Sequence, residues 1–177
     1  MTYENPTERL KAAIRNIPDF PQPGIQFKDI TPVLADPSLF STCLDQLLGT
    51  WKPGQVDAVV GIDARGFILA AAAAVRLQVG FVPVRKKGKL PYRTFEESYA
   101  LEYGTNTVAI HQDAFRPGSR VLLIDDLLAT GGTAAAAASL VRKAGGEILQ
   151  AAFFVELAFL GGRAKLAGVP LHSVVVF

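Results

Sequence analysis

Cysteine and histidine are scarce in this sequence, and their scarcity excludes several kinds of site. The single cysteine, Cys43, has no second cysteine with which to form an internal disulfide. One thiol and two histidines, His111 and His172, cannot supply the ligands of a tetrahedral zinc site. The first residues lack the basic and then apolar segments of a secretory leader, so we expect no signal peptide.

Long apolar runs and an excess of one charge are missing as well. The longest stretch without a charged residue, 127–141, consists mostly of alanine, glycine and threonine, whereas a membrane span needs about 18 strongly apolar residues. The net charge of +2 is too balanced for a protein that binds nucleic acid through its whole surface. We therefore expect a cytoplasmic protein with no membrane partner and no nucleic-acid partner.

Half of the 177 residues are hydrophobic, which is enough for the core of one domain. Two helices are expected first, one from an Asn5 cap to Ile17 and one from an Asp36 cap to Gly49, with an irregular proline-rich segment at 18–32 between them. From residue 58 onwards short apolar strands alternate with helices. We expect strands at 58–60, 81–84, 121–124, 148–155 and 171–176, helices at 67–77 and 131–141, and a hairpin over 99–111. This alternation predicts an α/β fold with a mainly parallel twisted sheet covered by helices.

The strongest candidate site follows the apolar strand at 121–124. Two carboxylates, Asp125 and Asp126, precede a loop that opens a helix and consists of Ala129, Thr130, Gly131, Gly132 and Thr133. Backbone amides at a helix N-terminus favour an anion such as a phosphate monoester. The carboxylates would repel that anion but suit ribose hydroxyls or a divalent cation. An ordinary strand-to-helix turn with a capping aspartate is the alternative.

Two further segments carry cations at the same expected sheet edge. Arg65, on a tight turn after the strand at 58–60, can hold two anionic oxygens in a fork, although it could also pair with Asp63 or Asp36. A basic run at 85–89 could be a solvated charge cluster or a nucleic-acid patch. It could equally steer and cover a pyrophosphate, and Gly88 and Pro91 suggest a loop that moves as a lid.

The order of motifs resembles one known family along nearly the whole chain. The stretch Asp-Asp-Leu-Leu-Ala-Thr-Gly-Gly-Thr at 125–133 resembles the phosphoribosyl-pyrophosphate (PRPP) signature of type I purine phosphoribosyltransferases. Residues 23–32 resemble that family's base-covering hood, and 61–67 resemble its pyrophosphate loop. Residues 85–91 with 101–104 resemble its mobile catalytic loop and returning strand, and 156–157, 162–163 and 165–166 resemble its tail. The sequence departs from many relatives at Tyr92 and Arg93.

The resemblance implies a fold, a reaction and a partner. The fold would be the type I phosphoribosyltransferase fold, as one domain over 1–177 with a hood at about 18–32 and a flexible loop at about 85–98. The reaction would convert adenine and PRPP to AMP and pyrophosphate, with Mg²⁺ held mainly through PRPP and with no direct protein ligand. A homodimer is expected from the family. A hypoxanthine, guanine or xanthine transferase is one alternative, and a PRPP-sensing transcriptional regulator is another.

The resemblance also assigns roles to individual residues. Residues 125, 126 and 129–133 would bind the 5′-phosphate and ribose, and Phe27 would stack on adenine while backbone groups around Gln26 and Lys28 read it. Glu102 would be the general acid or base, acting with Arg65 and Arg85. The residues expected on the pyrophosphate are Asp63, Ala64, Arg65, Arg85, Lys86 and Lys89.

Overall fold

The structure is a computed structural model that describes residues 5–100 and 104–177. The chain divides into two compact units, of which the first ends at Gly49 and the second runs from Thr50 to Phe177. Among the described residues, no helix is both long enough and apolar enough to cross a bilayer.

The first unit begins with a helix that is shorter than the sequence predicts. Helix α1 spans Pro6–Ala13, and the Asn5 side chain accepts a hydrogen bond from the Thr7 amide. The expectation of a helix to Ile17 was wrong, because strand β1 (Arg15–Pro18) pairs antiparallel with β2 (Gln26–Asp29). Strand β2 also lies within 18–32, the segment that we expected to be irregular because of its prolines. Tertiary pairing has overridden a local helical spacing.

The rest of the first unit is helical. Helix α2 (Thr31–Ala35) leads to α3 (Pro37–Leu48), whose first amides donate to the Asp36 carboxylate. The prediction of an Asp36 cap is confirmed, as is the end of the helix at Gly49. Cys43 lies on the buried face of α3, where burial raises the pKa of its thiol. The cysteine is therefore a core residue rather than a reactive one.

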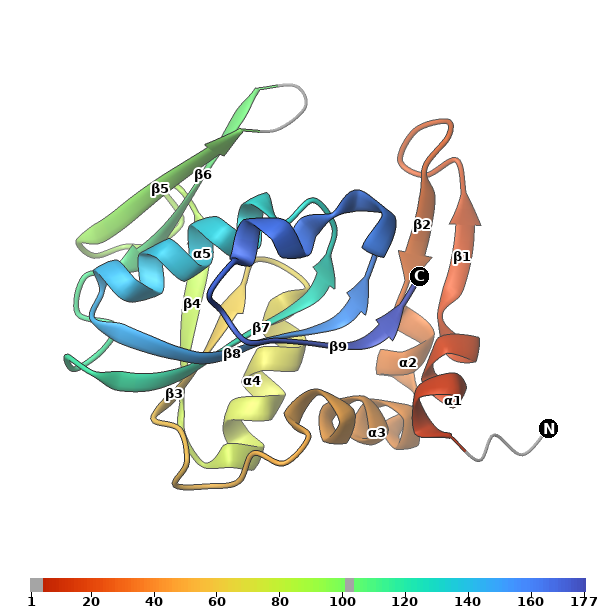
Figure 1. Ribbon diagram of the computed structural model, residues 1–177, viewed down its shortest axis with the longest axis horizontal. Helices are drawn as coiled ribbons and strands as arrows, with labels where there is room; N and C mark the ends of the chain where they lie inside the picture. The colour runs from red at the N-terminus through yellow and green to blue at the C-terminus, as the bar shows by residue number, and fades with distance from the viewer. Residues whose placement is uncertain (1–4, 101–103) are drawn as a thin grey trace. The chain divides into compact units, whose positions relative to one another are not determined.

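The second unit is built on one sheet, whose strand order among the described residues is β5-β6-β4-β3-β7-β8-β9 (Figure 1). The strands of its parallel part are β4 (Gly80–Lys86), β3 (Ala58–Ile62), β7 (Ser119–Leu128), β8 (Gly146–Glu156) and β9 (Leu171–Val176). The short 3₁₀ helices η1 (Ala158–Leu160) and η2 (Gly162–Leu166) connect β8 to β9. The predicted mainly parallel sheet is confirmed.

A hairpin extends the sheet at one edge. Strand β5 (Thr94–Ala100) pairs antiparallel with β6 (Thr105–His111), and β6 pairs antiparallel with β4. The turn between β4 and β5 therefore covers 87–93, and β5 begins inside the range that we expected to be a flexible loop. Full pairing with β6, in the register Thr94↔His111, explains this earlier start.

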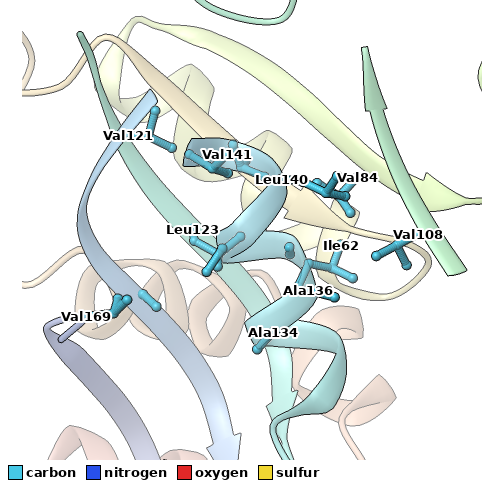
Figure 2. Packing of buried hydrophobic residues seen from close by; sticks show 14 of the residues in the cluster. Ile62, Val84, Val108, Val121, Leu123, Ala134, Ala136, Leu140, Val141 and Val169 are labelled. Carbon is cyan, nitrogen blue, oxygen red and sulfur yellow. The ribbon is translucent and has the colours of Figure 1, made fainter. Parts of the chain in front are cut away.

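Helices α4 (Gly66–Leu77) and α5 (Gly132–Lys143) lie on opposite faces of the sheet (Figure 1). Figure 2 shows Ala134, Leu140 and Val141 of α5 packed over Leu123 of β7 and Ile62 of β3, all of them buried. The alanine-rich inner side of α5 lets its backbone approach the strands closely. Close packing of this kind fixes where each helix begins at the sheet edge.

Candidate active site

Two neighbouring strands place two loops at the same edge of the sheet. Strands β3 and β7 are parallel and adjacent, with Val60 opposite Leu123 and Gly61 opposite Ile124. The loop after β3 leads into α4 at Gly66, and the loop after β7 leads into α5 at Gly132. Both helix N-termini therefore lie at the carboxyl ends of the strands, where α/β sheets bind ligands.

These loops line a cavity of about 370 Å³. One wall is formed by Asp63, Ala64 and Arg65, and the other by residues 125–134. The cavity therefore brings together the predicted phosphate loop and part of the predicted pyrophosphate loop. The N-termini of two helices, each with a partial positive charge, make the cavity suitable for an anion with more than one charged group.

Asp125 and Asp126 belong to strand β7 rather than to the loop. The strand continues to Leu128, because its pairing with β8 persists as far as Leu128 opposite Glu156. Both aspartates are buried, and the amide of Asp126 donates to Asp125 Oδ1 at 2.9 Å. Burial, and then the neighbouring charge of Asp126, raise the pKa of Asp125 well above its usual value. Two acids held in this way can accept hydrogen bonds from neutral hydroxyls.

Gly66 explains why Asp125 can lie so close to the start of α4. A Cβ added at Gly66 would lie 2.2 Å from Asp125 Oδ1 and 3.2 Å from Asp125 Cα. The α4 backbone thus packs directly against the carboxylate, which puts Asp125 beside a helix N-terminus. The partial positive charge there favours the ionised acid and opposes the effect of burial.

Arg65 forms an ion pair with Asp126, a partner that the sequence did not suggest. Its Nη2 lies 2.7 Å from Asp126 Oδ2, and the Asp126 side chain is 8% exposed. Burial raises the pKa of Asp126, and the Arg65 charge opposes that rise. The guanidinium side chain is 36% exposed, so it remains accessible from the cavity. Arg65 therefore connects the two walls of the site.

Arg85 links the basic turn to the wall of the cavity. Its Nε lies 3.3 Å from Asp63 Oδ2, and its Nη1 donates to the carbonyl oxygen of Lys89 at 3.0 Å. The amide of Lys89 donates to the Lys86 carbonyl oxygen, which closes the turn. Lys87 instead pairs with Glu96 of β5 at 2.7 Å. Arg85 is thus the member of the basic run that the structure ties to the predicted pyrophosphate loop.

The hairpin strand β5 contacts the phosphate loop through Tyr99. The Thr133 hydroxyl donates to the Tyr99 hydroxyl at 2.8 Å, and a Cβ added at Gly132 would lie 3.0 Å from the Tyr99 ring. Glu97 on the same side of β5 bonds Ser139 and pairs with Lys143 of α5. The sequence analysis did not identify Tyr99 as a site residue, although residues 95, 97 and 99 alternate along the strand and therefore share one face of it.

Three other predicted residues belong to the first unit. Gln26, Phe27 and Lys28 occupy β2 in the first unit, where the Phe27 ring packs edge-to-face on Phe20 with centroids 5.1 Å apart. Lys28 Nζ donates to Asn16 Oδ1 at 2.5 Å. Glu102 lies outside the described residues.

The side chains that line the cavity determine which metal ion it could hold. Within 5–100 and 104–177, no group of three or more His, Cys, Asp or Glu side chains is arranged to hold a metal ion. The two carboxylates of Asp125 and Asp126 nevertheless offer the oxygen donors that Mg²⁺ prefers when a phosphate supplies its other ligands. The residues therefore fit a divalent cation that arrives with a phosphorylated substrate and is held mainly by that substrate.

Comparison with known proteins shows one consistent likeness. The sequence profile of the phosphoribosyl transferase domain matches residues 39–169. The chain is similar to an adenine phosphoribosyltransferase from Acidothermus cellulolyticus, with 58% identity over 167 residues that cover 94% of each protein. It is also similar to the crystal structure of adenine phosphoribosyltransferase from Rhodothermus marinus, with a TM-score of 0.92 and 55% identity over 97% of this chain and 98% of that one.

A more distant structure shares the same architecture. It is an adenine phosphoribosyl transferase from Trypanosoma brucei in complex with AMP, pyrophosphate and ribose-5-phosphate. Its TM-score is 0.88 at 26% identity, over 99% of this chain and 82% of that one. The likeness extends over nearly the whole chain, as the order of motifs in the sequence predicts.

Proposed function

Because this chain belongs to the adenine phosphoribosyltransferase family, we propose that it converts adenine and PRPP to AMP and pyrophosphate. In this displacement the bond from ribose C1 to the pyrophosphate oxygen breaks and a bond from C1 to adenine N9 forms. The N9 proton leaves the purine, and the electron pair of the broken bond leaves with pyrophosphate. The observation that carries the proposal is the cavity in which two helix N-termini meet two buried carboxylates.

The 5′-phosphate is assigned to the loop at 129–133. Gly131 adopts a φ of 77°, which L side chains rarely adopt, and this conformation turns the backbone into the first turn of α5. Amides there and the Thr130 hydroxyl supply donors to the phosphate, and the Thr133 hydroxyl would join them by turning away from Tyr99, to which it donates in this structure. The ribose hydroxyls are assigned to Asp125 and Asp126, which fixes C1 between base and leaving group.

The pyrophosphate is assigned to the loop at 63–65 and to the basic turn. Arg65 lies at the cavity wall, and Arg85 is held beside that wall by Asp63. We assign Lys86 and Lys89 to the same group, since Lys89 lies on the turn that Arg85 contacts and Lys86 is the last residue before it. Mg²⁺ bound through PRPP would neutralise charge on the departing pyrophosphate. The arginines add charge stabilisation on the same group.

Adenine is assigned to the hood strand β2 and to Glu102. Phe27 would stack on the purine, and backbone groups around Gln26 and Lys28 would read its edge. A backbone carbonyl accepts a hydrogen bond from the six-amino group and offers nothing to a six-oxo group, which favours adenine over hypoxanthine. Glu102 would take the N9 proton.

We further propose that the protein is a homodimer. Ile68 and Val75 lie seven residues apart on one side of α4 and are 46% and 78% exposed. Apolar side chains exposed in this way are suited to cover the same helix of a second copy. Light scattering after gel filtration tests this, and a monomeric mass at micromolar concentration would contradict it. The cytoplasmic location and the lack of a nucleic-acid partner stay predictions.

The reaction is tested with the full chain, Mg²⁺ and PRPP, with adenine and hypoxanthine supplied in parallel assays. We expect stoichiometric AMP and pyrophosphate from adenine and little product from hypoxanthine. Equal or faster turnover of hypoxanthine would overturn the adenine assignment. DNA binding that depends on salt at physiological ionic strength, without turnover, would favour the regulator alternative.

A further inference from the structure

The segment that follows β8 packs against the phosphate loop backbone to backbone. A Cβ added at Gly162 of η2 would lie 2.2 Å from the Ala129 carbonyl oxygen. In the other direction, a Cβ added at Gly131 would lie 2.3 Å from the Gly162 carbonyl oxygen. The two backbone segments therefore lie closer together than any residue with a side chain would allow. Gly162 forms a wall against which the loop containing Gly131 packs.

An ion pair next to Gly162 fixes this wall to the sheet. Arg163 donates from Nε and Nη2 to the two carboxylate oxygens of Glu156, each at 2.6 Å. Glu156, at the end of β8, is 3% exposed, and the Arg163 hydrogen bonds lower its pKa. Arg163 Nη2 also donates to Ser173 Oγ of β9 at 3.3 Å. This two-pronged ion pair thus fixes Arg163, and through the peptide bond it restrains the neighbouring Gly162.

Both ends of the segment are also attached to the core. The amide of Leu157 donates to the Leu128 carbonyl oxygen at 2.9 Å, which joins its start to the end of β7. Leu166 at the end of η2 is 2% exposed and packs in the cluster that includes Ala134 of α5. A segment fixed at both ends and oriented by a two-pronged ion pair has little freedom to move away from the phosphate loop.

We infer that Glu156 and Arg163 are positioning residues for the 5′-phosphate, acting through Gly162 on the loop at 129–131. The inference rests on the proposed function, because it assigns that loop to the phosphate. Amides stabilise an anion only when they are already aimed at it, and a shift of a fraction of an ångström weakens several hydrogen bonds at once. Neither residue is assigned to the phosphate itself, so the pair positions the loop and is not catalytic.

The first test asks whether the Arg163→Met variant loses affinity for ligands that carry the 5′-phosphate but not for adenine, which lacks it. We expect its Kd for ribose 5-phosphate and its KM for PRPP to rise about tenfold, the order found when outer-shell partners of a binding group are removed. The KM for adenine at saturating PRPP should stay within about twofold, because adenine does not touch this loop in the proposed function. Arg163→Lys should restore part of the loss, since lysine keeps the charge but not the fork.

The matched control is Arg120→Met. Arg120 forms a two-pronged pair of the same geometry with Asp57, although Asp57 is more exposed than Glu156, at the opposite end of β7 from the phosphate loop. This variant should keep the wild-type Kd for ribose 5-phosphate. An Arg163→Met protein that loses affinity for adenine and PRPP equally, along with thermal stability, would show a merely structural role and would overturn the inference.

Gly162→Ala perturbs the contact between Gly162 and the phosphate loop and leaves the ion pair of Glu156 with Arg163 in place. Its methyl group would clash with the Ala129 carbonyl oxygen, so the phosphate loop must shift and affinity for ribose 5-phosphate should fall. Gly80→Ala is the control, because a Cβ at Gly80 meets no atom within 4 Å. If Arg163→Met and Gly162→Ala bind ribose 5-phosphate like the wild type, the inference is wrong and the proposed function stands. If the wild type binds no ribose 5-phosphate, both are wrong.

Discussion

The ion pair between Arg65 and Asp126 allows a quantitative test of the electrostatics of the cavity. Replacing Arg65 with methionine leaves Asp126 buried beside Asp125 without its positive partner. Breaking a buried pair from one side costs about 3–5 kcal/mol, whereas an exposed pair contributes about 0–1 kcal/mol. Since the Arg65 side chain is 36% exposed and that of Asp126 is 8%, we expect the free energy of unfolding to fall by about 2 kcal/mol at neutral pH.

The same substitution has a predicted pH dependence. Without Arg65, no nearby positive charge opposes the burial that raises the pKa of Asp126, so the folded state holds a proton that the unfolded state has already released. Stability then increases as pH falls toward the ordinary pKa of aspartate. The stability deficit of Arg65→Met relative to the wild type should therefore shrink at acidic pH.

Urea unfolding of a double-mutant cycle measures the coupling directly. In an Asp126→Asn background the Arg65→Met substitution should cost less than about 1 kcal/mol, because position 126 no longer carries the buried charge that Arg65 pairs with. Arg116→Met, at an exposed position of the same unit, is the control and should change stability by less than about 0.5 kcal/mol. Strict additivity of the Arg65 and Asp126 effects would refute the assignment of their contact as an energetically coupled pair.

Three further outcomes are expected. Asp125→Asn combined with Asp126→Asn should abolish most turnover in the PRPP assay while the circular dichroism spectrum stays native, and near-normal activity would rule out the ribose assignment. Glu102→Gln should lower kcat more than it raises the KM for adenine, and a change in KM alone would remove the acid-base role. Because Arg163 lowers the pKa of Glu156, that acid stabilises the fold above its ordinary pKa, and the contribution is lost as pH falls through the lowered value. Acid titration of stability should thus be shallower in Arg163→Met, and an unchanged slope would contradict this pair's role.

The local features of the site were predictable because they lie within one short stretch of sequence. An apolar strand, two acids, two glycines and two threonines specify a strand, a tight turn and a helix N-terminus, whichever fold contains them. The adjacency of the loop at 63–65 also followed, since the carboxyl ends of parallel strands share an edge. The resemblance to the type I phosphoribosyltransferases was confirmed by comparison with solved relatives.

What could not be predicted depends on partners distant in the chain. The partner of Arg65 proved to be Asp126 because β3 and β7 are neighbours in register, which no local spacing reveals. Tyr99 and Thr133 meet only because the hairpin lies over α5. The helix expected to reach Ile17 stopped at Ala13, since strand pairing with a segment that follows later in the chain outweighed a local apolar period.

The most direct measurement is a crystal structure of the protein with AMP bound. We expect the AMP phosphate within hydrogen-bonding distance of the amides at 129–133, with the ribose hydroxyls against Asp125 and Asp126. A nucleotide bound at another position, with this loop free of phosphate, would contradict the account at its centre.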